Sequence, residues 1–419
     1  MTRVRLAKNQ DRRLRSGHPW VFSNEIEAAE GQPGPGDEVL VEDHRGTPVG
    51  VGLYNPNSLI AVRLYSRRVR PIDEALFRDR IARAIALRRR ILPVERTYRL
   101  IHGEGDFLPG LVVDRYDDYL GVQSLTAGIE RRLELILPLL EETLQAKGII
   151  CRRDASGRAL EGLDRLDSIE WGHVPERVDA PYEGYILTVD LRGGQKTGEF
   201  LDQRENRLRV ARESHRRRVL DLYCHTGLFA LHCATAGAKS VLAIDSSGPA
   251  LDRARENHRR NALLRDVEFR EAQVEDALRA MGKEGERFDM IILDPPALVK
   301  SRKTLTEGLR KYAAVNASAM RLLPSGGALA TATCSHHVDA AAFLDVLRAA
   351  AKMAGARFRI VEVMGQARDH PVLLSARETS YLTMVLAERI DGAEPGATAG
   401  DETDDGETGD SGDTEEAAT

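Results

Sequence analysis

The chain contains no apolar run that approaches the ~18 residues of a membrane-spanning helix. Its N-terminus is basic but lacks the apolar segment of a secretory signal, so we expect none. Cysteine is scarce, and Cys151, Cys224, Cys233 and Cys334 form no CxxC pair, which argues against a disulfide framework. These absences favour a soluble globular protein in the reduced cytoplasm.

Negative charge is concentrated at the C-terminus. The net charge is −5, but residues 391–419 hold 11 of the 65 acidic residues and no Lys or Arg. The rest of the chain has 60 basic and 54 acidic residues (65 − 11), a balance of +6. Its basic residues cluster at Arg3–Arg15, Arg63–Arg70, Arg78–Arg90 and Arg207–Arg218. Such clusters suit a polyanion such as RNA, although solvated helix faces produce the same pattern.

Changes in pattern along the chain predict three units and a tail. Residues 1–70 have the strand-and-turn character of a small β-barrel, and residues 71–192 mix strands and helices in a small α/β unit. Residues 193–390 alternate strand and helix, which predicts a doubly wound, Rossmann-like α/β sheet. Residues 391–419 form an acidic tail that is expected to be disordered.

The expected elements follow from these patterns. In the first two units we expect strands at Glu38–Glu42, Thr47–Tyr54, Leu59–Tyr65, Leu111–Asp114, Tyr119–Ser124, Gly148–Arg152 and Ile186–Leu191, with helices at Ile72–Ile91 and Glu130–Ala146. In the third unit a helix at Gln203–Glu213 precedes strands at Arg218–Cys224, Ser240–Asp245, Val267–Glu271, Asp289–Asp294 and Ala328–Thr333. The closing strands Arg357–Met364 and Tyr381–Glu388 have no clear helical pattern between them and should be antiparallel.

Three polar side chains follow strands of the third unit. Asp294 begins a stiff Asp-Pro-Pro turn, and Cys334 comes directly after a buried strand. Because ligands bind outside the carboxyl ends of strands in open α/β sheets, we expect both side chains at one ligand-binding edge. Asp245 ends the second strand, where an acid can accept hydrogen bonds from ribose hydroxyls.

The loop after the first strand of this sheet lacks the GxGxxG pattern. It has one glycine, Gly227, within DLYCHTGLFAL. A pyrophosphate needs close backbone approach by several glycines, so a nicotinamide or flavin dinucleotide is disfavoured. A ligand with adenosine and no phosphate fits better, which indicates S-adenosylmethionine. The alternative is an α/β fold in which Asp245 caps a helix.

Longer strings are more specific than these single residues. They are HPWVFSNEI at His18–Ile26, YNPNSLIAVRL at Tyr54–Leu64, GEGDFLPGLVVDRY at Gly103–Tyr116, GQKTGEFLDQREN at Gly194–Asn206, DLYCHTGLFAL at Asp221–Leu231, DPPALVKS at Asp294–Ser301 and TCSHHV at Thr333–Val338. Through these strings Val4–Ile390 resembles the bacterial ribosomal large-subunit RNA cytosine-C5 methyltransferase I family. The resemblance covers about nine-tenths of the chain.

The resemblance implies an N-terminal PUA domain, a small central α/β domain and a class I methyltransferase domain with a mixed seven-stranded sheet. It implies methyl transfer from S-adenosylmethionine to C5 of a cytosine in 23S rRNA or a large-subunit precursor, and it allows a homodimer. The implied cofactor contacts are Lys196, Thr197, Asp202, Gln203, Arg204, Asp221, Tyr223, Gly227, Phe229, Asp245, Ser246, Gln273 and Asp294, with Gln195 in the same segment as Lys196. The family usually has an Asp near the adenine amino group where this chain has Gln273, whose carbonyl oxygen could accept the same hydrogen bond.

The implied chemistry explains the need for a thiol. Carbon 5 of cytosine is a poor nucleophile, but a thiolate that adds at carbon 6 makes it reactive. Cys334 is the candidate nucleophile, and Asp294 could hold or protonate ring nitrogen 3 of the base. A small buried hydrophobe is the alternative role for Cys334. His336 and His337 have no further Cys or His at ligand spacing, so no metal site is expected.

Three other functions remain open at this stage. A guanine-directed methyltransferase would carry the same Asp-Pro-Pro turn but need no thiol, so Cys334 discriminates against it. A decayed enzyme that only binds RNA is disfavoured by the intact set of Asp221, Gly227, Asp245, Asp294 and Cys334. A dehydrogenase is disfavoured by the single glycine.

The N-terminal unit mixes cations with aromatic side chains, namely Lys8, Arg12, Arg13, His18, Trp20 and Phe22. This composition suits phosphate contacts and base stacking. At least one of Trp20 and Phe22 is expected to pack in the barrel core instead.

Overall fold

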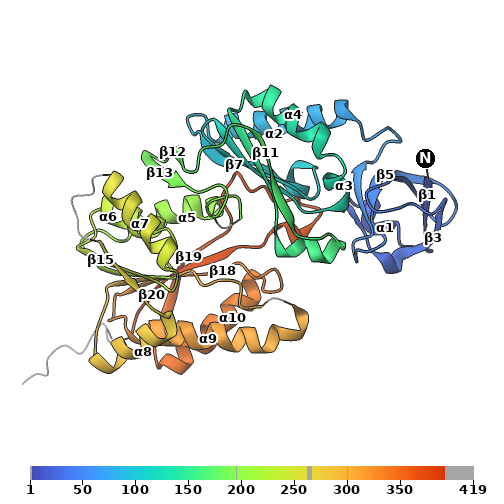
Figure 1. Ribbon diagram of the computed structural model, residues 1–419. Helices are drawn as coiled ribbons and strands as arrows, with labels where there is room; N and C mark the ends of the chain where they lie inside the picture. Colours follow the sequence, from blue (N-terminus) through green and yellow to red (C-terminus); the bar gives the residue numbers. More distant parts are fainter. Residues whose placement is uncertain (1, 195, 262–266, 300, 392–419) are drawn as a thin grey trace, which may run out of the picture.

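The computed structural model describes residues 2–194, 196–261, 267–299 and 301–391 (Figure 1). Gln195 and the predicted disordered tail beyond Asp391 lie outside the described residues. Figure 1 shows the N-terminal sheet at one end, the central sheet beside it and the C-terminal sheet at the other end. Among the described helices, none is long and apolar enough to cross a membrane.

Six strands form the N-terminal sheet, in the order β2-β6-β5-β4-β1-β3. Strand β1 pairs with β4 in parallel, and the other pairs are antiparallel. The sequence predicted the last three of these strands along the chain and missed the first three, which are short or only partly buried. The strands are β1 (Thr2–Leu6), β2 (Trp20–Val21), β3 (Ile26–Glu30), β4 (Glu38–Glu42), β5 (Pro48–Tyr54) and β6 (Val62–Ser66), with the short helix α1 (Arg12–Arg15).

The central part has a five-stranded sheet in the order β11-β10-β9-β8-β7 and a separate hairpin, β12-β13. Its elements are α2 (Glu74–Ile91), β7 (Thr97–His102), β8 (Leu111–Tyr116), β9 (Tyr119–Ser124), α3 (Ala127–Glu130), α4 (Leu133–Leu144), β10 (Gly148–Arg153), β11 (Leu166–Gly172), β12 (Val178–Tyr182) and β13 (Tyr185–Val189). Helix α2 begins after Asp73, whose side chain accepts a 3.0 Å hydrogen bond from the Leu76 amide.

The helix predicted at Glu130–Ala146 is confirmed over Leu133–Leu144, but it does not extend back to Glu130. The structure has two helices, α3 and α4, and Arg132 between them is not helical. The Arg132 guanidinium donates to the carbonyl oxygens of Gly128 and Gly36. The contact with Gly36 connects the interruption between α3 and α4 to the segment before β4. Helical periodicity cannot predict such a tertiary contact.

The C-terminal sheet has seven strands in the order β16-β15-β14-β17-β18-β20-β19. The first five are parallel, and β20 is antiparallel to both β18 and β19, as predicted. The strands are β14 (Arg218–Leu222), β15 (Ser240–Asp245), β16 (Val267–Glu271), β17 (Met290–Leu293), β18 (Ala328–Thr333), β19 (Phe358–Met364) and β20 (Thr383–Arg389). The helices are α5 (Arg204–Arg212), α6 (Leu228–Thr235), α7 (Gly248–Arg260), α8 (Val274–Glu284), α9 (Leu305–Arg321) and α10 (Ala340–Ala354).

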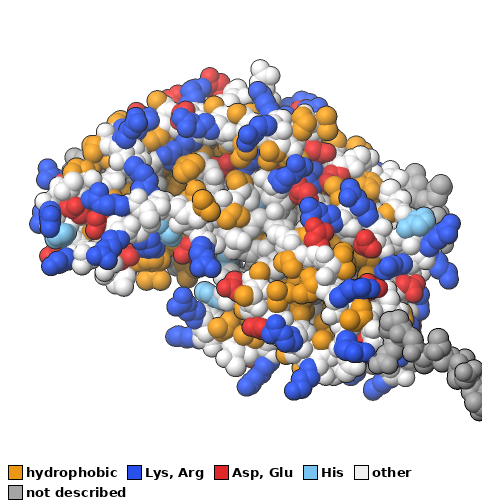
Figure 2. Space-filling model, turned by 180° about the vertical axis from the view of Figure 1, so that it is seen from behind, with side chains coloured by type: hydrophobic (Ala, Val, Ile, Leu, Met, Phe, Trp, Pro, Cys, Tyr) orange, Lys and Arg blue, Asp and Glu red, His pale blue; other side chains and the backbone are white. Residues whose placement is uncertain are grey.

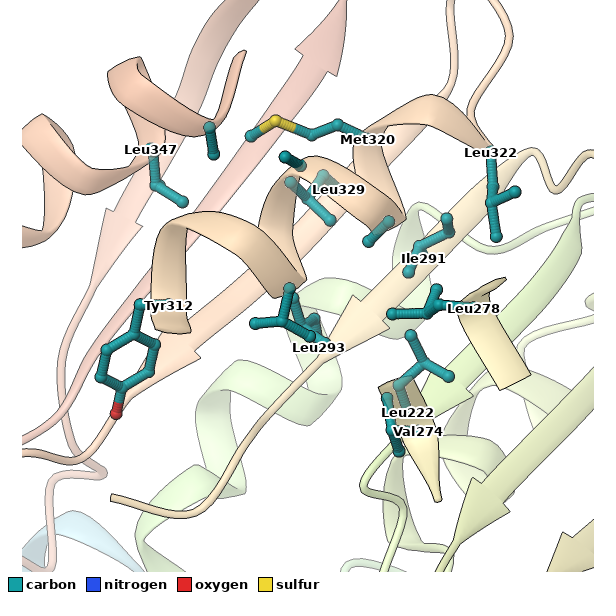
Figure 3. Close-up of a cluster of buried hydrophobic side chains, with 14 of the residues drawn as sticks. Leu222, Val274, Leu278, Ile291, Leu293, Tyr312, Met320, Leu322, Leu329 and Leu347 are labelled. Carbon is teal, nitrogen blue, oxygen red and sulfur yellow. The ribbon is translucent and has the colours of Figure 1, made fainter. Parts of the chain in front are cut away.

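Helices cover both faces of this sheet because successive strand side chains point to opposite faces. On one face, Leu222, Ile291 and Leu329 pack against α8, α9 and α10 (Figure 3). On the other face, Met290 and Ile292 pack in a second cluster with α5, α6 and α7. With both faces buried, the carboxyl edge of the parallel strands is where polar side chains remain accessible.

Candidate active site

Asp294 and Cys334 lie at the carboxyl ends of neighbouring parallel strands. Strands β17 and β18 pair with Leu293 opposite Thr331, so each residue comes just after its strand. Both side chains are half-buried. Burial and the charge of Asp294 raise the pKa of the Cys334 thiol to about 11, while Lys196 acts in the opposite direction. The sequence correctly placed the acid and the thiol on one edge.

A network of hydroxyl groups joins the two strand ends. The Tyr312 hydroxyl lies 2.9 Å from Oγ of Ser335 and accepts a 2.9 Å hydrogen bond from Thr333. The backbone amide of Val299, in the loop after the Asp-Pro-Pro turn, donates to Ser335 at 3.2 Å. Tyr312 is fully buried on α9, and its hydroxyl extends away from the apolar cluster in Figure 3. This network fixes the turn that carries Cys334 relative to the turn that carries Asp294.

The segment before α5 supplies the partners of Asp294. The Gln203 amide nitrogen donates to Oδ2 of Asp294 at 3.0 Å, and the Gln203 carbonyl oxygen accepts from Asn206 at 2.6 Å. Burial and the charge of Asp202 raise the pKa of Asp294 to about 6. Asp294 therefore titrates near neutral pH, a property that a proton donor or acceptor needs.

Asp202 is the centre of a second buried cluster. It accepts hydrogen bonds from Lys196 Nζ at 3.0 Å and from the Tyr381 hydroxyl at 2.6 Å. Burial acts to raise the pKa of Asp202, but Lys196, His370 and Tyr381 outweigh it, so the pKa lies well below its usual range. Lys196 also lies 4.3 Å over the ring of Phe200. The sequence predicted Tyr381 as the first residue of a closing strand and gave it no role in the site; it lies just before β20.

Asp245 organises the loop after β14. Its carboxylate accepts backbone hydrogen bonds of 2.9 Å from His225 and from Ser247. Gly227, with a φ of +73°, approaches closely enough that a Cβ there would lie 2.9 Å from the Phe269 ring. Asp245 is half-buried and Ser246 exposed, so both stay accessible at the carboxyl end of β15.

At the neighbouring strand end, Gln273 is an exposed N-cap residue of α8. The Tyr223 hydroxyl donates to Oε1 of Glu275 at 2.9 Å, two residues further along. Glu275 was not predicted as a site residue. Glu275 is an acid in the first turn of α8, where acidic residues are common, and it belongs to no motif that would have marked it as functional.

Six of the predicted cofactor residues have buried side chains, and besides Asp202 and Gln203 these are Thr197, Arg204, Asp221 and Phe229. Thr197 donates to the carboxylate of Asp114, and Arg204 lies 4.4 Å over the Tyr182 ring. Asp221 accepts from the backbone of Ala230 at 3.1 Å, and Phe229 is only 6% exposed. Thr197 and Arg204 thus join the segment at 196–204 to the central part of the chain, and Asp221 contacts the backbone of α6.

A buried acid also joins these two segments. Glu199 is 4% exposed, accepts a hydrogen bond from the Thr226 hydroxyl, and lies 3.5 Å from the His225 ring. Burial alone would raise its pKa, but His225 and Arg207 lower it to about 2. Glu199 was missed because it is one residue of a long motif with no spacing signal of its own.

The free cysteines differ in exposure. Cys334 is half-buried, whereas Cys151, Cys224 and Cys233 are buried. His336 and His337 are exposed, and the His336 ring lies 5.6 Å from the Tyr381 ring. Within the described residues, no group of three His, Cys, Asp or Glu side chains could hold a metal ion.

Two family models match the chain. Residues 4–67 match a PUA-like domain, and residues 98–377 match the S-adenosylmethionine-dependent methyltransferases. A Tolumonas auensis protein named ribosomal RNA large subunit methyltransferase I is 35% identical over 93% of this chain and all of its own length. A Vibrio cholerae protein of the same name is 36% identical over 90% of this chain and 97% of its own. The chain belongs to the ribosomal RNA large subunit methyltransferase I family.

Solved structures confirm the fold of this family member. A Streptococcus mutans protein assigned as a SAM-dependent methyltransferase matches with a TM-score of 0.80 and 17% identity, over 93% of this chain and its entire own length. A second structure, assigned as a methyltransferase and complexed with SAH, matches with a TM-score of 0.81 and the same identity and coverage. The chain is an S-adenosylmethionine-dependent methyltransferase, as predicted.

The residues at the carboxyl edge fit that cofactor. Asp245 is accessible to a ribose, and the loop with Gly227 has no second glycine for a pyrophosphate. Asp221 Oδ1 is buried under this loop without a hydrogen-bond partner among the described residues, which is unusual for a buried polar atom. An unsatisfied buried atom of this kind costs stability, which indicates that Asp221 serves the binding site rather than the fold.

Proposed function

We propose that this protein methylates C5 of a cytosine in the RNA of the large ribosomal subunit, through a covalent adduct with Cys334. The observation that carries the proposal is the pairing of a half-buried thiol with a carboxylic acid of raised pKa at adjacent strand ends. The family supplies the RNA class, since the similar proteins are named as methyltransferases of large-subunit ribosomal RNA.

In this mechanism the Cys334 thiolate adds to carbon 6 of the base, and the electrons of the ring move to carbon 5. The cofactor, when bound, supplies an electrophilic methyl group to that carbon. Asp294 gives a proton to ring nitrogen 3 during addition and takes it back as the adduct collapses. Loss of the proton from carbon 5 then expels the thiolate and restores the aromatic ring.

Lys196 contributes a positive charge to this site. It lowers the pKa of Cys334 and partly opposes the effect of Asp294. We assign it a role in stabilising the thiolate as well as the cofactor contact expected from the family. Asp245 would hold the ribose, and Tyr223, Ser246 and Gln273 lie on loops at the same edge.

The proposal also includes the RNA partner, the cellular location, the oligomeric state and the division into units. The basic residues suit RNA, and Lys and Arg side chains are prominent over the face of the molecule shown in Figure 2. An RNA substrate and four free cysteines favour a cytoplasmic setting. Light scattering would test whether the protein forms a homodimer, and limited proteolysis would test the proposed units 1–70, 71–192 and 193–390.

The test is nucleoside analysis of large-subunit RNA from cells that lack this gene, complemented with three versions of it. The wild type and the matched control Cys233→Ala should restore one 5-methylcytosine, and Cys334→Ala should not. Restoration by Cys334→Ala, or methyl groups on guanine, would overturn the proposed chemistry.

A further inference from the structure

A large groove lies between α8 and α9 and shares Glu275 with the site described above. It encloses about 910 Å³, and none of the residues assigned to the cofactor or the base lines it. Its apolar lining includes Leu278, Leu298, Val315 and Leu322. Six lining residues are cationic and one, Glu275, is acidic; the cations are Arg279, Lys283, Arg287, Lys311, Arg321 and Arg389.

Three of these six cations have no carboxylate partner among the described side chains. Arg279, Lys311 and Arg389 form ion pairs with Asp276, Glu307 and Asp391. Among the described side chains, no carboxylate lies within 4.0 Å of Lys283, Arg287 or Arg321. The last two donate only to backbone oxygens, those of Glu286 and Met353. A concave surface with unpaired cations attracts polyanions.

The apolar lining distinguishes between polyanions. Single-stranded nucleic acid is held by aromatic side chains on which its bases stack, and no aromatic residue lines this groove. Aliphatic walls below a cationic rim instead suit a polypeptide that carries acids and small apolar side chains.

Such a polypeptide begins at the end of the groove. The carboxylate of Asp391 accepts hydrogen bonds from the groove residue Arg389 at 2.6 Å and from the backbone of Arg357 at 2.9 Å. Asp391 is the first of the 11 acids in residues 391–419, so ten follow it in residues 392–419. That segment has no Lys, Arg, His or aromatic residue, and its other residues are mostly Gly, Ala and Thr.

The segment is long enough to reach the whole groove. Helix α8 has 11 residues and is therefore about 16 Å long. The 28 residues after Asp391 (419 − 391) span at most about 95 Å when extended. A tether of this kind gives an effective concentration on the order of millimolar, so weak intrinsic affinity is sufficient for occupancy.

We propose that the groove between α8 and α9 is a binding surface for the acidic segment 392–419 of the same chain. The segment neutralises Lys283, Arg287 and Arg321, and its small apolar side chains pack on the aliphatic walls of the groove. This interaction does not depend on the identity of the methylated base.

The first experiment measures binding in trans. A labelled peptide of residues 392–419 is titrated by fluorescence anisotropy against protein that ends at Asp391. We expect binding that weakens with added salt and falls at least tenfold in Lys283→Glu/Arg287→Glu. The control Arg212→Glu/Lys239→Glu, which changes two exposed cations elsewhere in this domain, should bind normally. Absence of binding at millimolar peptide, or equal binding to both variants, would overturn the proposal.

The second experiment uses the full-length chain. A carbodiimide joins amines to carboxylates in contact, and the products are mapped by mass spectrometry. Lys283 and Lys311 should be linked to acids of residues 392–419 more often than Lys8 or Lys239. An even distribution of cross-links over these lysines would contradict the proposal.

Discussion

The amide nitrogen of Gln203 donates a 3.0 Å hydrogen bond to the carboxylate of Asp294, 91 positions further along the chain. The hydrogen bond favours the charged form of Asp294 and so opposes the burial that raises its pKa to about 6. Gln203 is 3% exposed, and Asn206 fixes its orientation through a second hydrogen bond. The segment before the sheet thus sets the protonation of the acid at the end of β17.

We expect kcat/KM to rise with pH up to about 6 and then to level off. Below pH 6, Asp294 is protonated, and the thiolate fraction of Cys334 increases with pH. Above pH 6, that increase is offset as Asp294 loses its proton. Gln203→Leu removes a hydrogen bond to the charged form, so the pKa of Asp294 should rise and the profile should level off at higher pH. A profile that is unchanged in Gln203→Leu would contradict this role.

Asp221 should destabilise the protein at neutral pH. Burial and the charge of Asp294 raise its pKa to about 8, against about 3.9 in an unfolded chain. Between these two pH values the folded protein holds a proton that the unfolded chain releases, so stability falls as pH rises through the window. Asp221→Asn should raise the free energy of unfolding by on the order of 1–3 kcal/mol at pH 8 and by much less at pH 4. Denaturant titrations at both pH values measure this, and an equal effect at both would refute it.

Asp245 should contribute strongly to cofactor affinity. Charge-assisted hydrogen bonds to a ribose are worth about 1.5–3 kcal/mol, so Asp245→Ala should weaken S-adenosylmethionine binding about 10- to 150-fold. The same carboxylate accepts from the amides of His225 and Ser247, so the alanine variant also loosens the loop. Asp245→Asn keeps one acceptor and should lose less. Calorimetry measures the affinities, and unchanged binding in the alanine variant would refute the assignment.

Strand ends with a strong local signal were predicted correctly. Asp294 and Cys334 each follow a short apolar run, and parallel strands bring such ends together whatever the loops do. The cofactor contacts expected of Arg204 and Thr197 stay predictions, and both side chains are buried against the central part of the chain, which their motif alone does not show. Tyr381 and Tyr312 carry no motif. Their hydroxyl groups reach the site only because of how β20 and α9 pack against their neighbours.

The N-terminal sheet should bind RNA through fewer residues than its composition suggests. Arg13 lies 4.5 Å over the Phe22 ring and pairs with Glu25, and the Trp20 indole donates to Glu104 in the central part of the chain. Lys8 and Arg12 are exposed, and neither pairs with a carboxylate within the described ranges.

Lys8→Glu/Arg12→Glu should therefore lower RNA affinity and reduce the slope of its salt dependence by about 2. Cofactor affinity should not change. Filter binding at several salt concentrations would show the effect. An unchanged slope would mean that these cations do not contact phosphate.

Cys334 should form a covalent adduct with an RNA substrate that carries 5-fluorocytosine at the target position. The thiolate adds to carbon 6 and carbon 5 accepts the methyl group, but fluorine cannot leave as a proton does, so the adduct is trapped. Denaturing electrophoresis should show the complex for the wild type and for the buried-cysteine control Cys233→Ala, and not for Cys334→Ala. Cys334→Ala should still bind cofactor and RNA, which separates loss of chemistry from loss of folding. Methylation of normal cytosine by Cys334→Ala would show that the thiol is not the nucleophile. Asp294 would then be the central residue of a mechanism that methylates an amino or ring nitrogen atom of the base.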